Sequence, residues 1–265
     1  MKPIALAVNG ACGHMGRRLV QVAAADPEFR IVAACDVPGH AHEGEDVGHL
    51  CGLAELKVRI APALPFEPRP DVVIDFSSPR GTMWLLGACT TRQIPLVIGT
   101  MGHSDAELDE IRAAAHQTAI LKAQNLSLGM NVLAELVHRA AALMRGQPVD
   151  VEIVERHHRG KKEAPGLGTL RLAEIVEQQM GHYTRRHGRS GSQSERPPQE
   201  LGIHSLRAGD AAGEHLVLLA GLGETLELKH TVSSRDAFVR GALQAARFLV
   251  AQAPGWYEMS DVLGL

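Results

Sequence analysis

Two short stretches of the chain carry residue types that could do chemistry. The first is Gly-Ala-Cys-Gly-His-Met-Gly, which follows directly on an apolar run. A glycine turn here lets the backbone approach a pyrophosphate, and the next helix offers free N–H groups at the positive end of its dipole. An acid 20 residues later could accept hydrogen bonds from both ribose hydroxyls. The pattern predicts a dinucleotide site, against the alternative of a tight turn without a ligand, and its candidate residues are Gly10, Cys12, Gly13, His14, Met15, Gly16 and Asp36.

The residues around Asp36 also bear on the choice of cofactor. The stretch that follows it, 37–40, contains no Arg or Lys. A 2′-phosphate would therefore meet a carboxylate without a nearby guanidinium. We expect NADH to be used at least as well as NADPH, with Arg17 as the one cation that could reach round to a phosphate.

The second stretch is a basic loop within residues 155–169. Six of the seven residues from Arg156 to Lys162 are basic or His, in a chain whose net charge is -3. So local a patch favours a small anion over a polyanion. Pro165 and the pair Gly168-Thr169 open a helix whose N–H groups could bind a carboxylate, and a His beside Lys and Arg suits a proton donor. A solvated basic surface is the alternative. No metal site is predicted, because adjacent His residues on a strand point to opposite faces and no third ligand is evident.

Together the two stretches describe a reductase. A hydride donor, a cationic pocket and a proton donor are what reduction of a C=N or C=O bond on an anionic substrate requires.

The composition excludes several other classes. With 265 residues, 45% hydrophobic and 22% charged, the chain has an ordinary globular composition. Five Phe, two Tyr and two Trp make aromatic stacking an unexpected way to hold a ligand and argue against single-stranded nucleic-acid modules. No apolar run approaches ~18 residues, so no membrane partner is expected. The four cysteines form no CxxC pair, and with no signal peptide they favour a cytoplasmic location.

The elements that must position these residues alternate between strand and helix in the first half. Such βα units predict an α/β fold, a Rossmann-type domain with a parallel sheet and helices on both faces. A capping box at Ser104 and Glu107 opens one of the helices. The expected strands are 4–9, 31–35, 71–76, 95–99 and 120–123, and the expected helices are 15–25 and 104–116.

The second half predicts a separate α+β domain with a mixed sheet. Its polar segment 183–200, rich in Arg, Ser and Pro, is expected to be a long loop. The predicted boundaries are 1–128 for the dinucleotide domain, 129–238 for the second domain, which carries the basic loop, and 239–265 for a helix returning to the first domain. The expected strands here are 149–155, 202–206, 214–219 and 225–229, and the expected helices are 130–144, 170–179 and 237–251.

Several motifs in order, nearly end to end, resemble the 4-hydroxy-tetrahydrodipicolinate (dihydrodipicolinate) reductase family of lysine and diaminopimelate biosynthesis. Besides the glycine loop and the basic loop, they are Asp75-Phe76-Ser77, Gly99-Thr-Met-Gly102, Asn125-Leu-Ser-Leu-Gly-Met-Asn131, Arg207-Ala-Gly-Asp-Ala-Ala-Gly-Glu-His215 and Asp261-Val-Leu-Gly-Leu265. The resemblance implies a hinge between two domains, a homotetramer built by the second domain, and reduction of a C=C–C=N system by NADH or NADPH.

The resemblance also implies roles for single residues. His157 would be the general acid, assisted by Lys161, and His158 would help to hold the substrate. Gly168 and Thr169 would grip a substrate carboxylate. The nicotinamide would be contacted by Phe76, Gly99, Thr100, Gly102, Ala123 and Asn125.

The sequence departs from the family in the carboxylate clamp. The family has Asp-Ala-Pro-Ser-Gly-Thr after the Lys, whereas this chain has Glu163-Ala-Pro-Gly-Leu-Gly-Thr169, without the Ser hydroxyl and with one residue more. Met101 and Gln124 also replace residues usual at the nicotinamide. A relative that reduces a different cyclic or amino-acid-derived imine is therefore a second hypothesis, and a nicotinamide-binding sensor without catalysis is a third.

Overall fold

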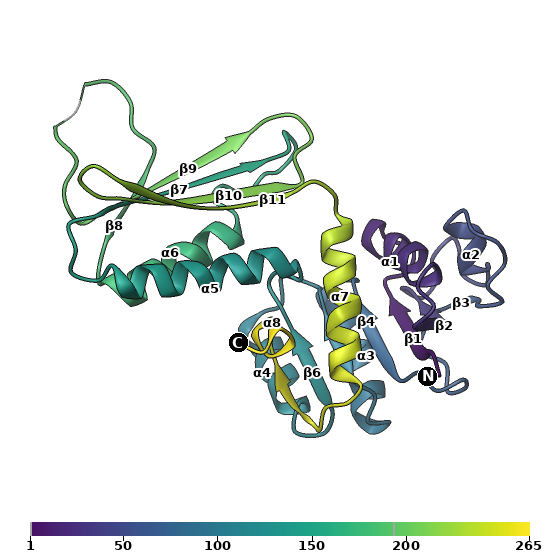
Figure 1. Ribbon diagram of the computed structural model, residues 1–265. Coiled ribbons are helices and arrows are strands. Elements are labelled where there is room, and N and C mark those ends of the chain that lie inside the picture. The colour runs from purple at the N-terminus through teal and green to yellow at the C-terminus, as the bar shows by residue number, and fades with distance from the viewer. Residues whose placement is uncertain (1, 193) are drawn as a thin grey trace. The chain divides into compact units, whose positions relative to one another are not determined.

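The computed structural model describes residues 2–192 and 194–265 and divides the chain into two compact units. The first unit combines the residues up to Ser127 with Asp236–Leu265, and the second unit is Leu128–Arg235. The sequence predicted boundaries after residues 128 and 238, whereas the structure places them after residues 127 and 235. The C-terminal segment Asp236–Leu265, at the yellow end of the colour bar in Figure 1, belongs to the same unit as the N-terminal residues.

The first unit is built on a sheet of seven parallel strands in the order β12-β6-β5-β4-β1-β2-β3. From β3 to β6 this is the order 3-2-1-4-5-6 of dinucleotide-binding sheets, whose direction of winding switches between β1 and β4. The predicted Rossmann-type parallel sheet is confirmed. The strands are β1 (Ile4–Asn9), β2 (Phe29–Cys35), β3 (Ile60–Ala61), β4 (Val72–Asp75), β5 (Leu96–Ile98), β6 (Ala119–Lys122) and β12 (Gly255–Tyr257).

Helices cover both faces of this sheet, because its central strands are apolar on both sides. α3 and α4 pack together over the face that carries Val73, Leu96 and Ile98. α1 packs against α7, and α7 contacts β4, β5 and β6 from the opposite face. The capping box of α4 is formed as predicted, since Ser104 N–H donates to Glu107 at 2.7 Å. The helices are α1 (His14–Ala24), α2 (Val47–Leu50), α3 (Pro79–Thr91), α4 (Asp105–Ala114), α7 (Asp236–Leu249) and α8 (Met259–Leu263).

The second unit has a five-stranded mixed sheet in the order β11-β10-β7-β9-β8. β11, β10 and β7 pair antiparallel, whereas β9 pairs parallel with both β7 and β8. Helices α5 and α6 lie along one face of the sheet (Figure 1) and share with it a core of aliphatic residues. The predicted α+β domain with a mixed sheet is confirmed. Its elements are α5 (Leu128–Leu143), β7 (Asp150–His157), α6 (Leu167–Met180), β8 (Thr184–His187), β9 (Glu200–Arg207), β10 (Gly213–Ala220) and β11 (Thr225–Val232).

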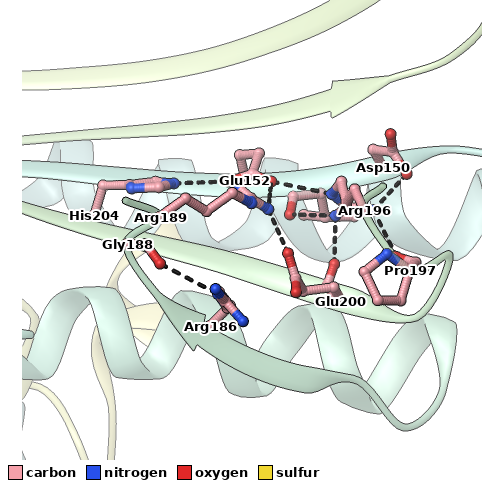
Figure 2. Close-up of polar contacts among 10 residues, drawn as sticks. Asp150, Glu152, Arg186, Gly188, Arg189, Arg196, Pro197, Glu200 and His204 are labelled. Carbon is pink, nitrogen blue, oxygen red and sulfur yellow. Dashed lines mark hydrogen bonds and ion pairs between the residues drawn. The ribbon is translucent and has the colours of Figure 1, made fainter. Parts of the chain in front are cut away.

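The prediction of one long loop over 183–200 is wrong in part, because β8 adds an edge strand there. Figure 2 shows how two arginines of this segment are held: Arg189 and Arg196 both donate to Glu152 on β7, at 2.7 and 3.1 Å. Burial raises the pKa of Glu152, but these hydrogen bonds and one from His204 outweigh burial and hold it at about 2. Arg189 and Arg196, which belong to the polar segment predicted as a loop, are therefore ion-pair partners of the sheet.

Five further elements were not expected from the sequence: α2, α3, β3, β12 and α8. Among the residues that the structure describes, no helix combines the length and the apolar composition that crossing a membrane would need.

Candidate active site

The glycine loop joins β1 to α1 at the point where the sheet order switches. Gly10 has φ +77°, and a Cβ there would lie 2.3 Å from the carbonyl oxygen of Phe76. A Cβ at Gly16 would lie 2.0 Å from the carbonyl oxygen of Gly10. The fold itself therefore requires glycine at both positions.

Gly13 differs, because a Cβ there would meet only the Gly10 carbonyl at 3.4 Å. Packing does not demand glycine at this position. Gly13 is exposed and is the N-cap of α1 without a side-chain cap, so the first N–H groups of the helix stay accessible. A pyrophosphate fits such a cradle. His14 and Met15 follow in the first turn, exposed and half-buried respectively.

Asp36 lies just past β2 beside the same loop. One carboxylate oxygen accepts a hydrogen bond from Cys12 N–H at 2.7 Å, and the other accepts one from Val37 N–H at 2.9 Å. Arg17 Nε donates to the carbonyl of Cys12 at 2.8 Å. The structure thus brings the predicted acid to the glycine loop and ties Arg17 to the loop backbone.

Asp75 was quoted in a motif but given no role, and it organises this end of the sheet. It is fully buried at the end of β4. Asn9 Nδ2 at the end of β1, Thr82 Oγ1 on α3 and Thr100 Oγ1 after β5 donate to its carboxylate at 2.8, 2.5 and 2.9 Å. Ser77 adds its N–H and its hydroxyl. One carboxylate therefore fixes the ends of three neighbouring strands.

We expect Asp75→Asn to lower the free energy of unfolding by about 2–3 kcal/mol, because an amide in this place turns an N–H₂ group toward buried donors. Thermal unfolding followed by circular dichroism measures the change. Asp109→Asn is the matched control, since Asp109 is exposed on α4, where it pairs with Arg112 of the same helix. Equal midpoints for the two variants would contradict this role of Asp75.

The residues expected at the nicotinamide lie at the carboxyl ends of β4, β5 and β6, which are neighbours in the sheet. Gly99 is in contact with Phe76, since a Cβ at Gly99 would lie 2.3 Å from the Phe76 ring. The hydroxyl of Thr100 donates to the carboxylate of Asp75, while Gly102 is exposed. Ala123 is buried, and Asn125 accepts a hydrogen bond from Ser127 N–H at 2.9 Å. The structure brings all six residues of this group to one edge of the first unit.

Two further titratable groups at this edge were missed by the sequence reasoning. Burial lowers the pKa of Lys122, which donates to the carbonyl of Thr100 at 3.3 Å. Burial and the charge of Lys122 lower the pKa of His103, and neither ring nitrogen of His103 has a hydrogen-bond partner among the described residues. The sequence signal for Lys122 was a cation ending the apolar run of β6.

In the second unit, His157 ends β7. Its Nδ1 lies 3.3 Å from the carbonyl oxygen of Ala212, and its Nε2 lies 3.8 Å from the carboxylate of Glu155. Burial lowers the pKa of His157, Glu155 raises it and Lys161 lowers it, so that the pKa lies below its usual range. Strand alternation places Glu155 and His157 on the same face of the sheet.

Glu155 is the central residue of this site, and no role had been predicted for it. It is fully buried and accepts hydrogen bonds from Gly166 N–H at 2.9 Å, Thr169 Oγ1 at 2.6 Å and Arg207 Nη2 at 2.7 Å. Burial raises the pKa of Glu155, but these hydrogen bonds and one from Ser205 hold it at about 2. The carboxylate therefore stays ionised and fixes the start of α6 beside His157.

The predicted carboxylate clamp has a different geometry from the one expected. Thr169 is fully buried and its hydroxyl donates to Glu155, so a contact of Thr169 with substrate would have to come from its backbone N–H. Gly168 is half-buried in the first turn of α6, where N–H groups have no partner within the helix. Lys161 lies beside the start of α6, since a Cβ at its N-cap Gly166 would lie 3.1 Å from the Cε of Lys161. His158 is half-buried beside Gly160.

His215 on β10 completes the cluster. It pairs across the strands with Glu155, and its ring lies edge-to-face on His157 with centroids 5.4 Å apart. Burial, and then the charge of His157, lower the pKa of His215 to about 4. Potential ligand atoms of Glu155, His157 and His215 lie within 4.8 Å of one another, close enough for a metal ion. Both Glu155 oxygens already accept strong hydrogen bonds, which favours acid–base chemistry over metal binding.

Nearly all of the chain matches models of one family. Models of the N-terminal and C-terminal parts of dihydrodipicolinate reductase match residues 4–126 and 129–263. The chain belongs to the dihydrodipicolinate reductase family. The resemblance that the motifs carried is thereby confirmed, and so is the class of oxidoreductase. The glycine loop fits the nicotinamide cofactor that this family implies.

Individual relatives agree with the family assignment. Two curated relatives are named 4-hydroxy-tetrahydrodipicolinate reductase: the protein from Nitrosomonas europaea is 39% identical over 100% of both chains, and that from Halorhodospira halophila is 40% identical over 99% of both. A dipicolinate-bound dihydrodipicolinate reductase from Paenisporosarcina sp. TG-14 has the same fold, with TM-score 0.77 and 23% identity over 97% of this chain and 98% of that one.

Proposed function

We propose that this chain reduces 4-hydroxy-tetrahydrodipicolinate (dihydrodipicolinate) to tetrahydrodipicolinate in lysine and diaminopimelate biosynthesis, with NADH or NADPH as the reductant. The observation that carries the proposal is the cluster in the second unit, where Glu155 holds the start of α6 next to His157. A proton donor, the cation of Lys161 and free helix N–H groups are thus held on one side of the sheet. A small dicarboxylate with a reducible C=C–C=N system needs these groups.

The roles of the chain's own residues follow from their chemistry. Lys161 and the first N–H groups of α6, including that of Gly168, bind a carboxylate, with His158 as a further contact. His157 delivers the proton that completes the reduction, and the negative charge of a bound dicarboxylate raises its pKa toward the protonated form. The cofactor, when bound, supplies the hydride. His215 stays neutral and keeps the His157 ring in place.

The test is a coupled assay in which pyruvate and aspartate semialdehyde generate the substrate enzymatically and cofactor oxidation is followed at its nicotinamide absorbance. Robust turnover supports the proposal. Binding of cofactor without turnover, in this assay and with a panel of other cyclic imines, would contradict it and favour the sensor hypothesis.

A second candidate substrate class is another cyclic or amino-acid-derived imine. One observation favours it: the clamp lacks the Ser hydroxyl of the family, and its Thr169 hydroxyl is occupied by Glu155. Fewer side-chain donors would then hold the usual substrate carboxylate. The imine panel distinguishes the two classes by their kcat/KM ratios.

NADH is expected to support a kcat/KM at least equal to that of NADPH. Cys12 N–H fixes the carboxylate of Asp36, the residue expected at the adenosine ribose, and Arg17 donates to the Cys12 carbonyl. Like-charge repulsion thus opposes the phosphate. Asp36→Ser should shift the ratio toward NADPH. Initial rates at varied concentrations of each cofactor decide the matter, and a tenfold preference of the unaltered chain for NADPH would overturn it.

We also propose that the chain forms a homotetramer through the second unit, as the resemblance implied. The sheet face that α5 and α6 leave uncovered carries Val154, Leu206, Leu216 and Leu218, and Leu206 is 50% exposed. Such a face gains stability when a second copy covers it. The cytoplasmic location stays a prediction, and four free buried cysteines are compatible with it.

A further inference from the structure

A groove of about 100 Å³ in the first unit runs between α3 and the segment after β3. One face of α3 lines it with Trp84, Leu85 and Ala88, and Leu64 lies across from them. Asp36 lies at the same groove. A slot with apolar walls and one carboxylate suits a flat, uncharged ring attached to a sugar, and it does not suit a phosphate.

Trp84 is the unusual residue of this groove. It is 51% exposed, in a chain with only two Trp in all. The guanidinium of Arg80, one helical turn earlier, lies 4.5 Å from the centroid of the indole ring. Among the described residues, those lining the groove include Trp84 but not Arg80. The guanidinium therefore holds the ring by a cation–π contact without itself lining the groove.

We infer that Trp84 is an adenine-stacking residue, with Arg80 as its positioning residue. The inference rests on the proposed function, because it takes the nicotinamide cofactor as the ligand. With the ribose hydroxyls on Asp36, the adenine enters the groove toward α3, where the indole offers a flat surface. The adenine edges then meet the aliphatic side chains of Leu64 and Leu85.

This assignment runs against the expectation drawn from composition. Few aromatic residues made stacking an unexpected way to hold a ligand, yet one indole suffices when the fold places it at the groove. Stacking on Trp is indifferent to a 2′-phosphate, so it raises the affinity for both cofactors and leaves discrimination to Asp36.

The two tryptophans permit a direct test. In Trp256→Phe, Trp84 is the only Trp, and in Trp84→Phe the only one is Trp256 on β12. AMP should quench the fluorescence of Trp256→Phe and leave that of Trp84→Phe unchanged. Nicotinamide mononucleotide should change neither. In calorimetry, Trp84→Ala should bind ADP-ribose about tenfold more weakly, because aromatic–base stacking contributes on this scale. Trp84→Phe, which keeps a ring, should lose less.

The outcomes separate this inference from the proposed function. If Trp84→Ala has the native circular dichroism spectrum and binds ADP-ribose within about twofold of the unaltered chain, the Trp84 inference is overturned and the proposed function stands. If AMP quenches neither variant although both bind ADP-ribose, the result is the same. If the unaltered chain binds no ADP-ribose, the dinucleotide site and the proposed function are both overturned.

Discussion

Replacing His157 by glutamine is expected to lower kcat by about 10²- to 10⁴-fold, the range that loss of a positioned general acid produces. His157 is held between the Ala212 carbonyl and the Glu155 carboxylate, and glutamine fills much of its volume but does not deliver a proton. The coupled assay measures kcat. Calorimetry should show an unchanged Kd for ADP-ribose, since the residues that hold it belong to the first unit.

His187→Gln is the matched control, because His187 is an exposed histidine on β8 of the same unit. It should keep the kcat of the unaltered chain. A His157→Gln variant that retains more than a tenth of kcat would show that the proton comes from another group.

The same residue sets the expected pH dependence. His157 must be protonated to act, and its pKa in the free protein lies below the usual value of about 6.5. The kcat/KM should therefore fall as pH rises through a midpoint below about 6.5. A bound dicarboxylate raises the pKa, so kcat should persist to higher pH than kcat/KM. A kcat/KM profile that is flat between pH 5.5 and 8 would contradict this assignment.

Replacing Glu155 by glutamine is expected to lower the free energy of unfolding by about 3–5 kcal/mol, the cost of leaving one partner of a buried ion pair alone. Arg207 loses its carboxylate, and the donors Gly166 N–H and Thr169 Oγ1 meet an amide group in place of an oxygen. The pH limb of kcat/KM should also move lower, because Glu155 raises the pKa of His157. Thermal unfolding and the pH profile measure the two effects.

Glu227→Gln on β11 provides the comparison, since Glu227 is an exposed carboxylate on the same sheet. Its unfolding midpoint should match that of the unaltered chain. If Glu155→Gln unfolds at the same temperature as Glu227→Gln, the buried carboxylate does not hold the site together.

Most of the fold could be predicted because its signals are local. The runs 4–8 and 72–74 are apolar throughout, as strands buried on both faces must be, and the capping box at Ser104 is a pattern of four residues. The segment 183–200 could not be predicted as a whole, because Arg189 and Arg196 pair with Glu152, which lies more than thirty residues away. Composition alone does not tell a paired arginine from a solvated one.

In the candidate site, too, some residues could be predicted from local sequence, whereas others depend on the tertiary structure. The sequence by itself determined the glycine loop with Asp36 and the basic loop with His157 and Lys161, since short spacings constrain the backbone that follows a strand. Only the tertiary structure decided that Thr169 turns to Glu155, that His215 lies on His157, and that Trp84 lies at a groove with Asp36. These contacts join residues 14 to 58 positions apart through strand pairing and helix packing. Local sequence does not show which distant side chain will lie next to a given residue.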